Sequence, residues 1–295
     1  MTREPRLLSA DTWESYELLD SGDGRKLERF GAHTVIRPEP QVVWPAALGA
    51  DAWDGADAHF QPDEGGRGGW RRATSAVPTS WEIHYAGVPF EVGFTNFRHL
   101  GVFPEQAVQW DWLAERIAAG QGTVRVLNLF AYTGVASLIA ANAGARVTHL
   151  DASKKAITWA NTNQARAGLN EAPIRWICDD ALKFLRREAR RGRTYDVIVL
   201  DPPKYGRGPK GEVWQLHEQL WELLTLSREV LARDGLGVVT TVYAIRMSSA
   251  SLDTALGAAF GVSPAEREHG EMAVRDRAGR AVAAAAFARW PRGTR

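Results

Sequence analysis

The residues whose types point most directly to chemistry follow the apolar run VIVL, in the segment DPPKYGRG at 201–208. Two successive prolines end a strand and stiffen the backbone, so Asp201 and the peptide carbonyls of Pro202 and Pro203 are expected to project into a cleft. Such a turn suits a planar base, on which Tyr205 could stack, with phosphate-binding cations beside it: Lys204, Arg207 and Lys210. A purely structural turn is the alternative.

An earlier segment, NLFAYTG at 128–134, ends a strand-like run and opens a helical one. The free N–H groups of a helix that begins here can face a polar ligand. The segment has a single glycine and lacks the G-x-G-x-x-G pattern of dinucleotide sites. A strand-to-helix turn without a ligand is an equally good interpretation of this segment taken alone.

Carboxylates follow the next two apolar runs. Asp151, in HLDAS at 149–153, can accept both hydroxyl protons of a ribose, although Asp151 or Ser153 would also cap the following helix. In CDD at 178–180, Asp179 or Asp180 could accept a hydrogen bond from the exocyclic amine of an adenine. The alternative for this pair is again the start of a helix.

The elements that must position these residues alternate along the chain after Gly122. Short apolar runs such as TVRVLNLF alternate with helical patterns, which is typical of a doubly wound, Rossmann-like α/β sheet covered on both faces. In such sheets ligands bind beyond the carboxyl ends of the strands, where all four segments would meet. The final run EMAVRDRAGRAVAAAAFARW predicts two strands around a turn at 278–279, which would add an antiparallel edge.

A different pattern precedes residue 98. The text from Tyr16 to Pro38 predicts short strands around the turn 21–24, and 81–94 predicts a hairpin around Ala86 and Gly87. Residues 45–75 are rich in Gly, Ala, Asp and Pro and predict a long surface loop around short pieces of structure. A helical stripe over 104–119 joins the halves. We therefore predict a β-rich domain at 1–97 that shapes the substrate side, and an α/β domain at 98–295.

Composition excludes several classes of protein. The chain has 295 residues, 45% of them hydrophobic, and a net charge of +1, which excludes disordered and fibrous classes. A single cysteine, Cys178, excludes an intramolecular disulfide and a multi-cysteine zinc site, and it predicts a reducing, cytoplasmic location. The seven histidines show no metal-ligand spacing, so we expect no metal, and no apolar run has the ~18 residues of a membrane helix. The basic run over 183–193 fits either a phosphate-binding strip or a solvated helix face.

The four segments together resemble a known family. NLFAYTG, HLDAS, CDDALKFL and DPPKYGRG, in this order and spacing, look like motifs I to IV of class I S-adenosylmethionine-dependent methyltransferases. They are most similar to the group that contains the 23S ribosomal RNA large-subunit base methyltransferases. FRHLGVFPEQAVQWDW resembles the segment that precedes motif I in that group, and YELLDSGDGRKLERFG resembles its amino-terminal β region.

The resemblance implies roles for individual residues. Motif I and its neighbours would bind S-adenosylmethionine and its product S-adenosylhomocysteine, which gives the methionine contact to Asn128, Phe130, Tyr132, Thr133 and Gly134, and the ribose contact to Asp151 with Ala152 and Ser153. Asp179 and Asp180 would contact the adenine, and Phe103 and Gln106 would fold over the cofactor. Asp201, Pro202, Pro203 and Tyr205 would place the target base, with Lys204 and Arg207 binding the substrate.

The chain departs from the family pattern at one important place. Members that make 5-methylcytosine need a cysteine thiolate after the fifth strand, where this chain reads TTVYAIR and has none. Cys178 lies in the adenosine motif and is expected to be a buried structural thiol. A covalent mechanism is therefore disfavoured, and the expected chemistry is direct in-line transfer to a nitrogen, oxygen or other nucleophile.

We therefore expect a methyltransferase that acts on a nucleic-acid base, with ribosomal RNA as the partner. The near-neutral charge, and the expectation that the chain lacks the family's amino-terminal RNA-binding domain, favour an alternative, a methyltransferase of a small molecule or a protein. A non-catalytic RNA-binding module on the same fold is a second alternative, which the intact motifs I and IV oppose. Oligomeric state does not follow from the sequence.

Overall fold

The computed structural model describes residues 4–10, 13–63, 68–243 and 246–292. Contacts between Cα atoms divide the chain into two compact units. The first, here called the α/β unit, comprises 1–8, 108–272 and 284–295, and the second, here called the β unit, comprises 9–107 and 273–283. Residues 98–107, predicted with the α/β domain, lie in the β unit, where Gly93 N–H donates to the carbonyl of Leu100 and the Tyr85 hydroxyl donates to that of Ala107.

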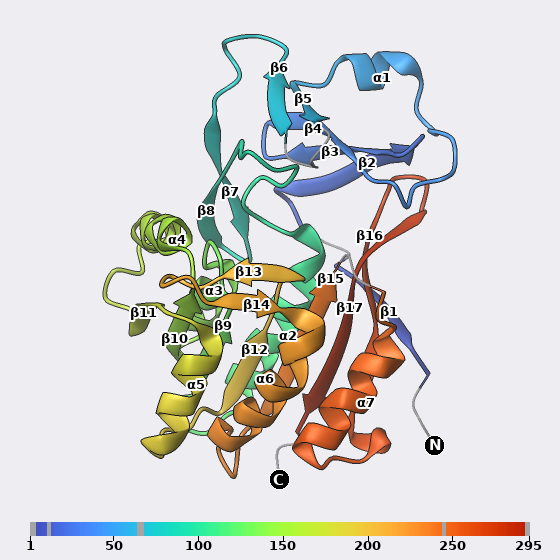
Figure 1. The fold of residues 1–295 in the computed structure, drawn as a ribbon. Helices are drawn as coiled ribbons and strands as arrows, with labels where there is room; N and C mark the ends of the chain where they lie inside the picture. Colours follow the sequence, from blue (N-terminus) through green and yellow to red (C-terminus); the bar gives the residue numbers. More distant parts are fainter. Residues whose placement is uncertain (1–3, 11–12, 64–67, 244–245, 293–295) are drawn as a thin grey trace. The chain divides into compact units, whose positions relative to one another are not determined.

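An eight-stranded sheet with the order β1-β16-β17-β15-β12-β9-β10-β11 forms the centre of the α/β unit (Figure 1). The five strands from β15 to β11 run parallel, and β17 pairs antiparallel with β15, as the sequence predicts. The strands span Arg6–Ser9 (β1), Arg125–Leu129 (β9), Arg146–Asp151 (β10), Ile174–Cys178 (β11), Val197–Leu200 (β12), Gly237–Tyr243 (β15), Glu268–Arg275 (β16) and Ala281–Pro291 (β17). The doubly wound fold class is therefore confirmed.

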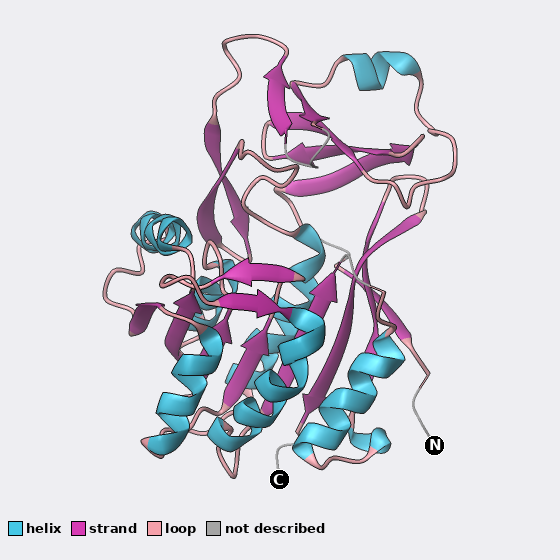
Figure 2. Ribbon diagram, in the orientation of Figure 1, coloured by secondary structure: helices cyan, strands magenta, loops and turns pink. Residues whose placement is uncertain are grey.

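Helices cover both faces of this sheet (Figure 2). One buried core contains Leu127 and Leu150 of the sheet with leucines of α5, α6 and α7, and another joins Val126 and Val147 to α2 and α3. Alternate residues of a strand point to opposite faces, which is why neighbours such as Val126 and Leu127 enter different cores. The helices are α2 (Ala107–Ala118), α3 (Val135–Asn142), α4 (Lys154–Arg166), α5 (Ala181–Arg190), α6 (Leu216–Val230) and α7 (Ser249–Phe260), with the 3₁₀ turns η1 (Pro104–Gln106) and η2 (Pro264–Glu266). Among the described residues, none of these helices has both the length and the apolar composition needed to cross a membrane.

The β unit contains a five-stranded sheet and a separate hairpin. Its strands are β2 (Tyr16–Gly22), β3 (Arg25–Phe30), β4 (His33–Pro38), β5 (Ala58–Pro62) and β6 (Gly68–Arg72) in the sheet, and β7 (Ser80–Tyr85) and β8 (Val88–Gly93) in the hairpin. The stretch 45–75, predicted as a long surface loop around short pieces of structure, contains helix α1 (Ala50–Asp54) and the strands β5 and β6. Trp53 and Phe60 are buried in this stretch. Its overall composition, rich in Gly and Asp, gives no indication that these few large side chains form part of a core.

A buried ion pair lies within the β unit. The Glu28 carboxylate is fully buried and accepts two hydrogen bonds from Arg37, with N–O distances of 2.6 and 2.7 Å, and one from the Tyr16 hydroxyl at 2.8 Å. Burial alone would raise the pKa of Glu28, but the charges of Arg37 and Lys26 and the hydrogen bonds lower it to about 2. Because the charge of the buried Glu28 carboxylate is balanced by these contacts, the Glu28–Arg37 pair stabilises the fold only while both side chains are present.

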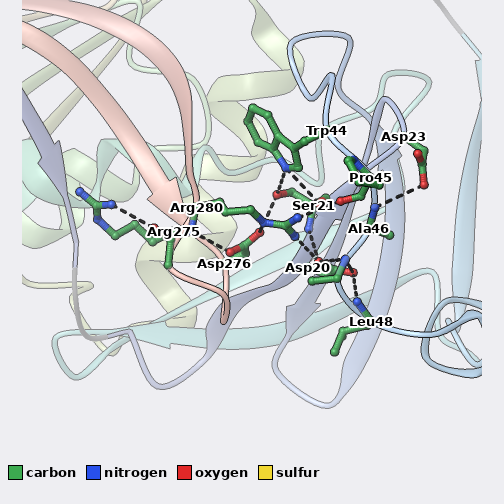
Figure 3. A network of polar contacts seen from close by, with 12 residues as sticks. Asp20, Ser21, Asp23, Trp44, Pro45, Ala46, Leu48, Arg275, Asp276 and Arg280 are labelled. Atoms are coloured by element: carbon green, nitrogen blue, oxygen red, sulfur yellow. Dashed lines mark hydrogen bonds and ion pairs between the residues drawn. The ribbon is translucent and has the colours of Figure 1, made fainter.

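The tip of the β16–β17 hairpin also belongs to the β unit (Figure 3). Asp276 accepts hydrogen bonds from the Ser21 hydroxyl at 2.6 Å and from Arg280 Nε at 2.8 Å, and Arg280 also pairs with Asp20. The buried Asp20 carboxylate further accepts from the backbone N–H of Leu48 at 2.8 Å. Residues 273–283 are therefore fixed to β2 and to the segment after β4 by charge-assisted hydrogen bonds.

Candidate active site

The turn between β9 and α3 has an unusual backbone conformation. Phe130 (φ 57°) and Tyr132 (φ 48°) are non-glycine residues in the left-handed region, and Gly134 (φ 88°) follows them as the N-cap of α3. Each such non-glycine residue costs about 1–3 kcal/mol, a strain that persists in proteins mainly at functional sites. Within the described part of the chain no side chain caps α3, so its first N–H groups are available to a ligand.

Asp151 holds this turn against the end of β10. Its two carboxylate oxygens accept from the backbone N–H of Tyr132 at 2.9 Å and of Ser153 at 2.7 Å. Burial raises the pKa of Asp151, and the two N–H bonds act in the opposite direction. Ser153 is the N-cap of α4 and accepts from Ala156 N–H, so the capping alternative holds for Ser153. A carboxylate placed at the strand end beside the turn can still accept from a diol.

Close packing beneath Gly134 explains why this position is a glycine. A Cβ atom there would lie 2.9 Å from Cβ of Ala160 on α4, which is closer than side chains pack. Asn163, one turn further along α4 and fully buried, donates to the carbonyl of the buried Thr133 at 3.0 Å. The sequence analysis did not identify Asn163, although a polar residue on the buried stripe of Ala156 and Ala160 is a detectable signal.

A buried polar chain lies behind the same turn. The amide of Asn128, 2% exposed, donates to Ser137 Oγ at 3.0 Å, and that hydroxyl lies 3.0 Å from Nδ1 of the fully buried His149. Burial lowers the pKa of His149 to about 3. The Asn128 side chain thus has a structural partner on α3, and its contact with a cofactor stays a prediction. Sequence reasoning missed Ser137 and His149 because their contact depends on how α3 packs against β9 and β10.

The third segment forms the start of α5. Asp180 is the N-cap, accepting from Lys183 N–H at 2.9 Å, and Asp179 accepts from Arg187 at 2.8 Å, so the helix-start interpretation is correct for Asp180. Cys178 was predicted to be a buried thiol, and this was wrong. The sulfur is exposed because β11 is the edge strand of the sheet and Cys178 is its last residue. Partial burial and the charges of Asp151 and Asp179 raise its pKa, which opposes a role as a nucleophile.

The DPP turn follows β12 and is fixed from both sides. Asp201 accepts a hydrogen bond from the hydroxyl of the buried Thr241 on β15. The carbonyl of Pro203 accepts from Trp214 Nε1 at 2.6 Å, and the Trp214 ring packs 4.9 Å from that of Phe130. Pro202 is buried. The turn after β12 is therefore tied, through Trp214, to the strained turn after β9.

The residues after this turn form a short hairpin of β13 (Tyr205–Arg207) and β14 (Val213–Gln215). Tyr205 is 63% exposed, and the ammonium group of Lys204 lies 5.3 Å from the centre of its ring. Arg207 is also exposed. Glu212, in the loop between β13 and β14, pairs with Lys183 on α5. The hairpin thus presents an aromatic ring and two cations to solvent.

The sheet brings four of the predicted segments together. Because β12, β9, β10 and β11 are consecutive neighbours, their carboxyl ends place Asp201, the Phe130–Gly134 turn, Asp151 and Asp179 in one row. Ala152 lies in this row, and its carbonyl is 3.5 Å from the Cys178 sulfur. Phe103 and Gln106 lie in the β unit, before and within η1, so their cofactor contacts stay predictions. Within the described part of the chain, no group of three or more His, Cys, Asp or Glu side chains could hold a metal ion.

This sheet order, with a strained turn after β9 and an acidic residue after β10, defines a class I methyltransferase fold. The family model described as S-adenosylmethionine-dependent methyltransferase matches residues 56–242, and the chain belongs to that family. A solved structure of a SAM-dependent methyltransferase from Agrobacterium tumefaciens is 46% identical, with a TM-score of 0.93 and coverage of 98% of this chain and 94% of that one. The structure of the methyltransferase SMU.776 complexed with SAH has a TM-score of 0.71 and 18% identity, covering 94% of this chain and 75% of that chain, which supports the fold alone.

Curated relatives match over shorter stretches. Ribosomal RNA large subunit methyltransferase K/L of Pseudomonas putida is 34% identical over 65% of this chain and 25% of its own length. Ribosomal RNA large subunit methyltransferase I of Shewanella amazonensis is 43% identical over 32% of this chain and 23% of its own length. The matched region spans about a quarter of these relatives.

The residues at the site fit the methyl donor of the family, S-adenosylmethionine. The left-handed residues Phe130 and Tyr132 turn the backbone sharply ahead of uncapped N–H groups, a geometry suited to a polar amino-acid moiety. The Asp151 carboxylate next to it suits a ribose diol. When bound, the cofactor would supply a methyl group on a positively charged sulfur.

Proposed function

We propose that this chain methylates a base of ribosomal RNA by direct transfer, without a cysteine adduct. The single observation that carries the proposal is the arrangement after β12. There Asp201 is fixed by Thr241, next to the strained turn, and Tyr205, Lys204 and Arg207 are exposed on the adjoining hairpin. An aromatic ring with neighbouring cations suits an unpaired base and its phosphates. The names of the curated relatives agree with this class of substrate.

The residues of this chain would act mainly by alignment. The bound cofactor would supply its methyl group to a lone pair of the base, the electron pair of the carbon–sulfur bond would stay on sulfur, and S-adenosylhomocysteine would be the product. The proton lost from the nucleophile passes to Asp201 or to water. Thr241 fixes Asp201 in one orientation, and Pro202 and Pro203 keep the backbone rigid, so the base can be held about 3 Å from the methyl group.

Methyl-labelled S-adenosylmethionine tests this proposal when deproteinised ribosomal RNA, intact ribosomal subunits and a small-molecule extract are offered in parallel. Label in RNA, located by nucleoside digestion, supports it, and 5-methylcytosine as the product would contradict the direct mechanism. Label only in protein or in the small-molecule fraction would overturn the RNA substrate and leave the family assignment intact.

Two variants separate the roles at the site. Asp201→Asn should lower kcat about 10²-fold or more, with S-adenosylhomocysteine binding unchanged, because its carboxylate acts on the substrate. Tyr205→Ala should raise KM for RNA, whereas Tyr205→Phe should behave as the parent, because a stacking ring needs no hydroxyl. Equal effects of Ala and Phe at residue 205 would contradict stacking.

A further inference from the structure

A second pocket lies in the α/β unit at the amino-terminal edge of the sheet, opposite the strand ends that form the active site. Its volume is about 590 Å³. It is lined by the first residues of three parallel strands and by the segment between α5 and β12: Arg125, Arg146, Val147, Thr148, Pro173, Ile174, Arg175, Gly192, Arg193, Thr194 and Tyr195. Four of these residues are arginines.

The strand register places three of the arginines on one face of the sheet. Arg125 and Arg146 are Cα partners on β9 and β10, and Thr148 is the partner of Arg175 on β10 and β11. Paired residues of parallel strands point to the same face, and residues 146 and 148 also share a face because side chains alternate along a strand. Neighbouring strands are about 4.8 Å apart, so like charges on adjacent strands repel.

The fourth arginine reaches the pocket through the end of α5. Gly192 adopts a left-handed conformation (φ 61°) after the helix, and the N–H of Arg193 donates to the carbonyl of Glu188 at 3.0 Å. Backbone N–H groups donate to the last carbonyls of the helix, from Arg191, Gly192 and Arg193. These hydrogen bonds reduce the repulsion between the carbonyl oxygens and an anion in the pocket. Three earlier cations of this basic run are paired elsewhere: Lys183 with Glu212, Arg186 with Glu222 and Arg187 with Asp179.

The carboxylates near the pocket do not neutralise it. Asp196 forms a two-point ion pair with Arg125, at 2.7 and 3.0 Å. The buried Glu188 accepts from the Tyr195 hydroxyl at 2.8 Å and lies 3.8 Å from Arg175 and 3.6 Å from Arg191. Arg125 and Arg175 are therefore ion-paired, and within the described part of the chain the other two arginines of the pocket are not. Among the residues that the structure describes, the exposed side chains of Arg146 and Arg193 have no hydrogen-bond or ion-pair partner.

We infer that this pocket binds clustered phosphate groups. Planar guanidinium groups bind phosphate oxygens by two parallel hydrogen bonds. Two guanidinium groups without a partner among the described residues, Arg146 and Arg193, beside two ion-paired ones in a concave site favour a ligand with more than one phosphate over a single carboxylate. Thr148 and Thr194 add hydroxyl groups to the lining. The phosphates would belong either to an RNA backbone or to a free compound with a pyrophosphate group, and the inference does not depend on which substrate is methylated.

The test uses the full chain and two probes, sodium pyrophosphate by calorimetry and a short fluorescein-labelled single-stranded RNA by anisotropy. The double variant R146Q/R193Q removes the two unpaired guanidinium groups, and R146K/R193K keeps their charge. Arg228→Gln is the matched control, because Arg228 is an exposed arginine on α6 that does not line the pocket. Thermal unfolding and S-adenosylhomocysteine binding show that each variant is folded.

We expect R146Q/R193Q to bind pyrophosphate at least about tenfold more weakly, with an intermediate effect for R146K/R193K and none for Arg228→Gln. If RNA is the source of the phosphates, RNA affinity falls as well, and the slope of log K against log salt decreases by roughly 0.7 for each phosphate that is no longer neutralised. An effect on pyrophosphate alone identifies a small phosphate compound. Equal affinities of parent and R146Q/R193Q for both probes, or no binding of either probe by the parent, would overturn the inference.

Discussion

The substitution Gly134→Ala tests whether the turn after β9 is held by packing as well as by backbone conformation. Gly134 and Gly144 lie at opposite ends of α3 and have nearly the same φ, 88° and 90°. They differ in their surroundings: a Cβ at Gly134 would lie 2.9 Å from Ala160, whereas no described atom lies within 4 Å of a Cβ at Gly144. Gly144→Ala is therefore a control for conformation alone.

The structure gives the expected size of each effect. A left-handed alanine costs about 1–2 kcal/mol, which should be the whole effect of Gly144→Ala on the free energy of unfolding. At Gly134 the clash adds about 1–3 kcal/mol, because Ala160 belongs to the buried face of α4 and cannot move freely. Gly134→Ala should thus destabilise by about 2–5 kcal/mol.

Urea unfolding followed by circular dichroism measures both variants, and calorimetry measures their affinity for S-adenosylhomocysteine. Gly134→Ala should also weaken that affinity, because the shift reaches Thr133 and Tyr132, while Gly144→Ala should bind as the parent. Adding Ala160→Gly should recover part of the loss, reduced by the roughly 1 kcal/mol cost of a helical glycine. Equal destabilisation by Gly134→Ala and Gly144→Ala would refute the packing argument.

Three further predictions concern titratable side chains. Asp151→Asn should weaken S-adenosylhomocysteine binding about tenfold or more in calorimetry, because it removes an ionised acceptor, and an unchanged affinity would exclude the ribose role. Arg37→Met should lower the free energy of unfolding by about 3–5 kcal/mol in urea, because it leaves the Glu28 carboxylate charged and buried. The double variant Glu28→Leu with Arg37→Met should have a free energy of unfolding close to that of the parent. Equal losses of stability in the single and double variants would argue against an unpaired buried charge. The pKa of His149 falls from 6.5 to about 3 on folding, so the unfolded chain binds the extra proton between these values and stability decreases as pH falls through this window, by up to about 1.4 kcal/mol per unit. His149→Asn should lose that part of the slope, and an unchanged slope in urea titrations at several pH values would contradict it.

Much of the fold follows from local pattern. The alternation after Gly122, the turns expected within 21–24, at 86–87 and at 278–279, and the antiparallel addition of β17 to the parallel strands were all predictable, because each depends on a period or a turn signal within a few residues. The positions of α1, β5 and β6 within 45–75 were not predictable, because they depend on two large buried side chains, Trp53 and Phe60, in a segment of loop-like composition. The assignment of 273–283 to the β unit was also not predictable, since it depends on pairs such as Ser21 and Asp276, which lie 255 residues apart.

The candidate active site also contains features that the sequence predicts and features that it does not. Motif order was sufficient to find the row of strand ends, because parallel topology brings those ends together whatever the side chains. The residues that fix the turns at these strand ends were not predicted, because they act through contacts between elements that are distant in sequence. They are Thr241, Trp214 and Asn163. Cys178 was placed in the interior because its strand reads as apolar, and only the sheet order reveals β11 as an edge.

The anchored tip of the β16–β17 hairpin has a consequence for synthesis of the chain. Asp20 and Ser21 belong to β2, and their partners Arg280 and Asp276 follow them by 260 and 255 residues. Until those partners arrive, the buried Asp20 lacks its ion pair with Arg280, and the β unit stays incomplete while most of the α/β unit has already been synthesised. Contacts of such long sequence separation form slowly, so the β unit is expected to complete its fold only after residues 273–283 have been synthesised.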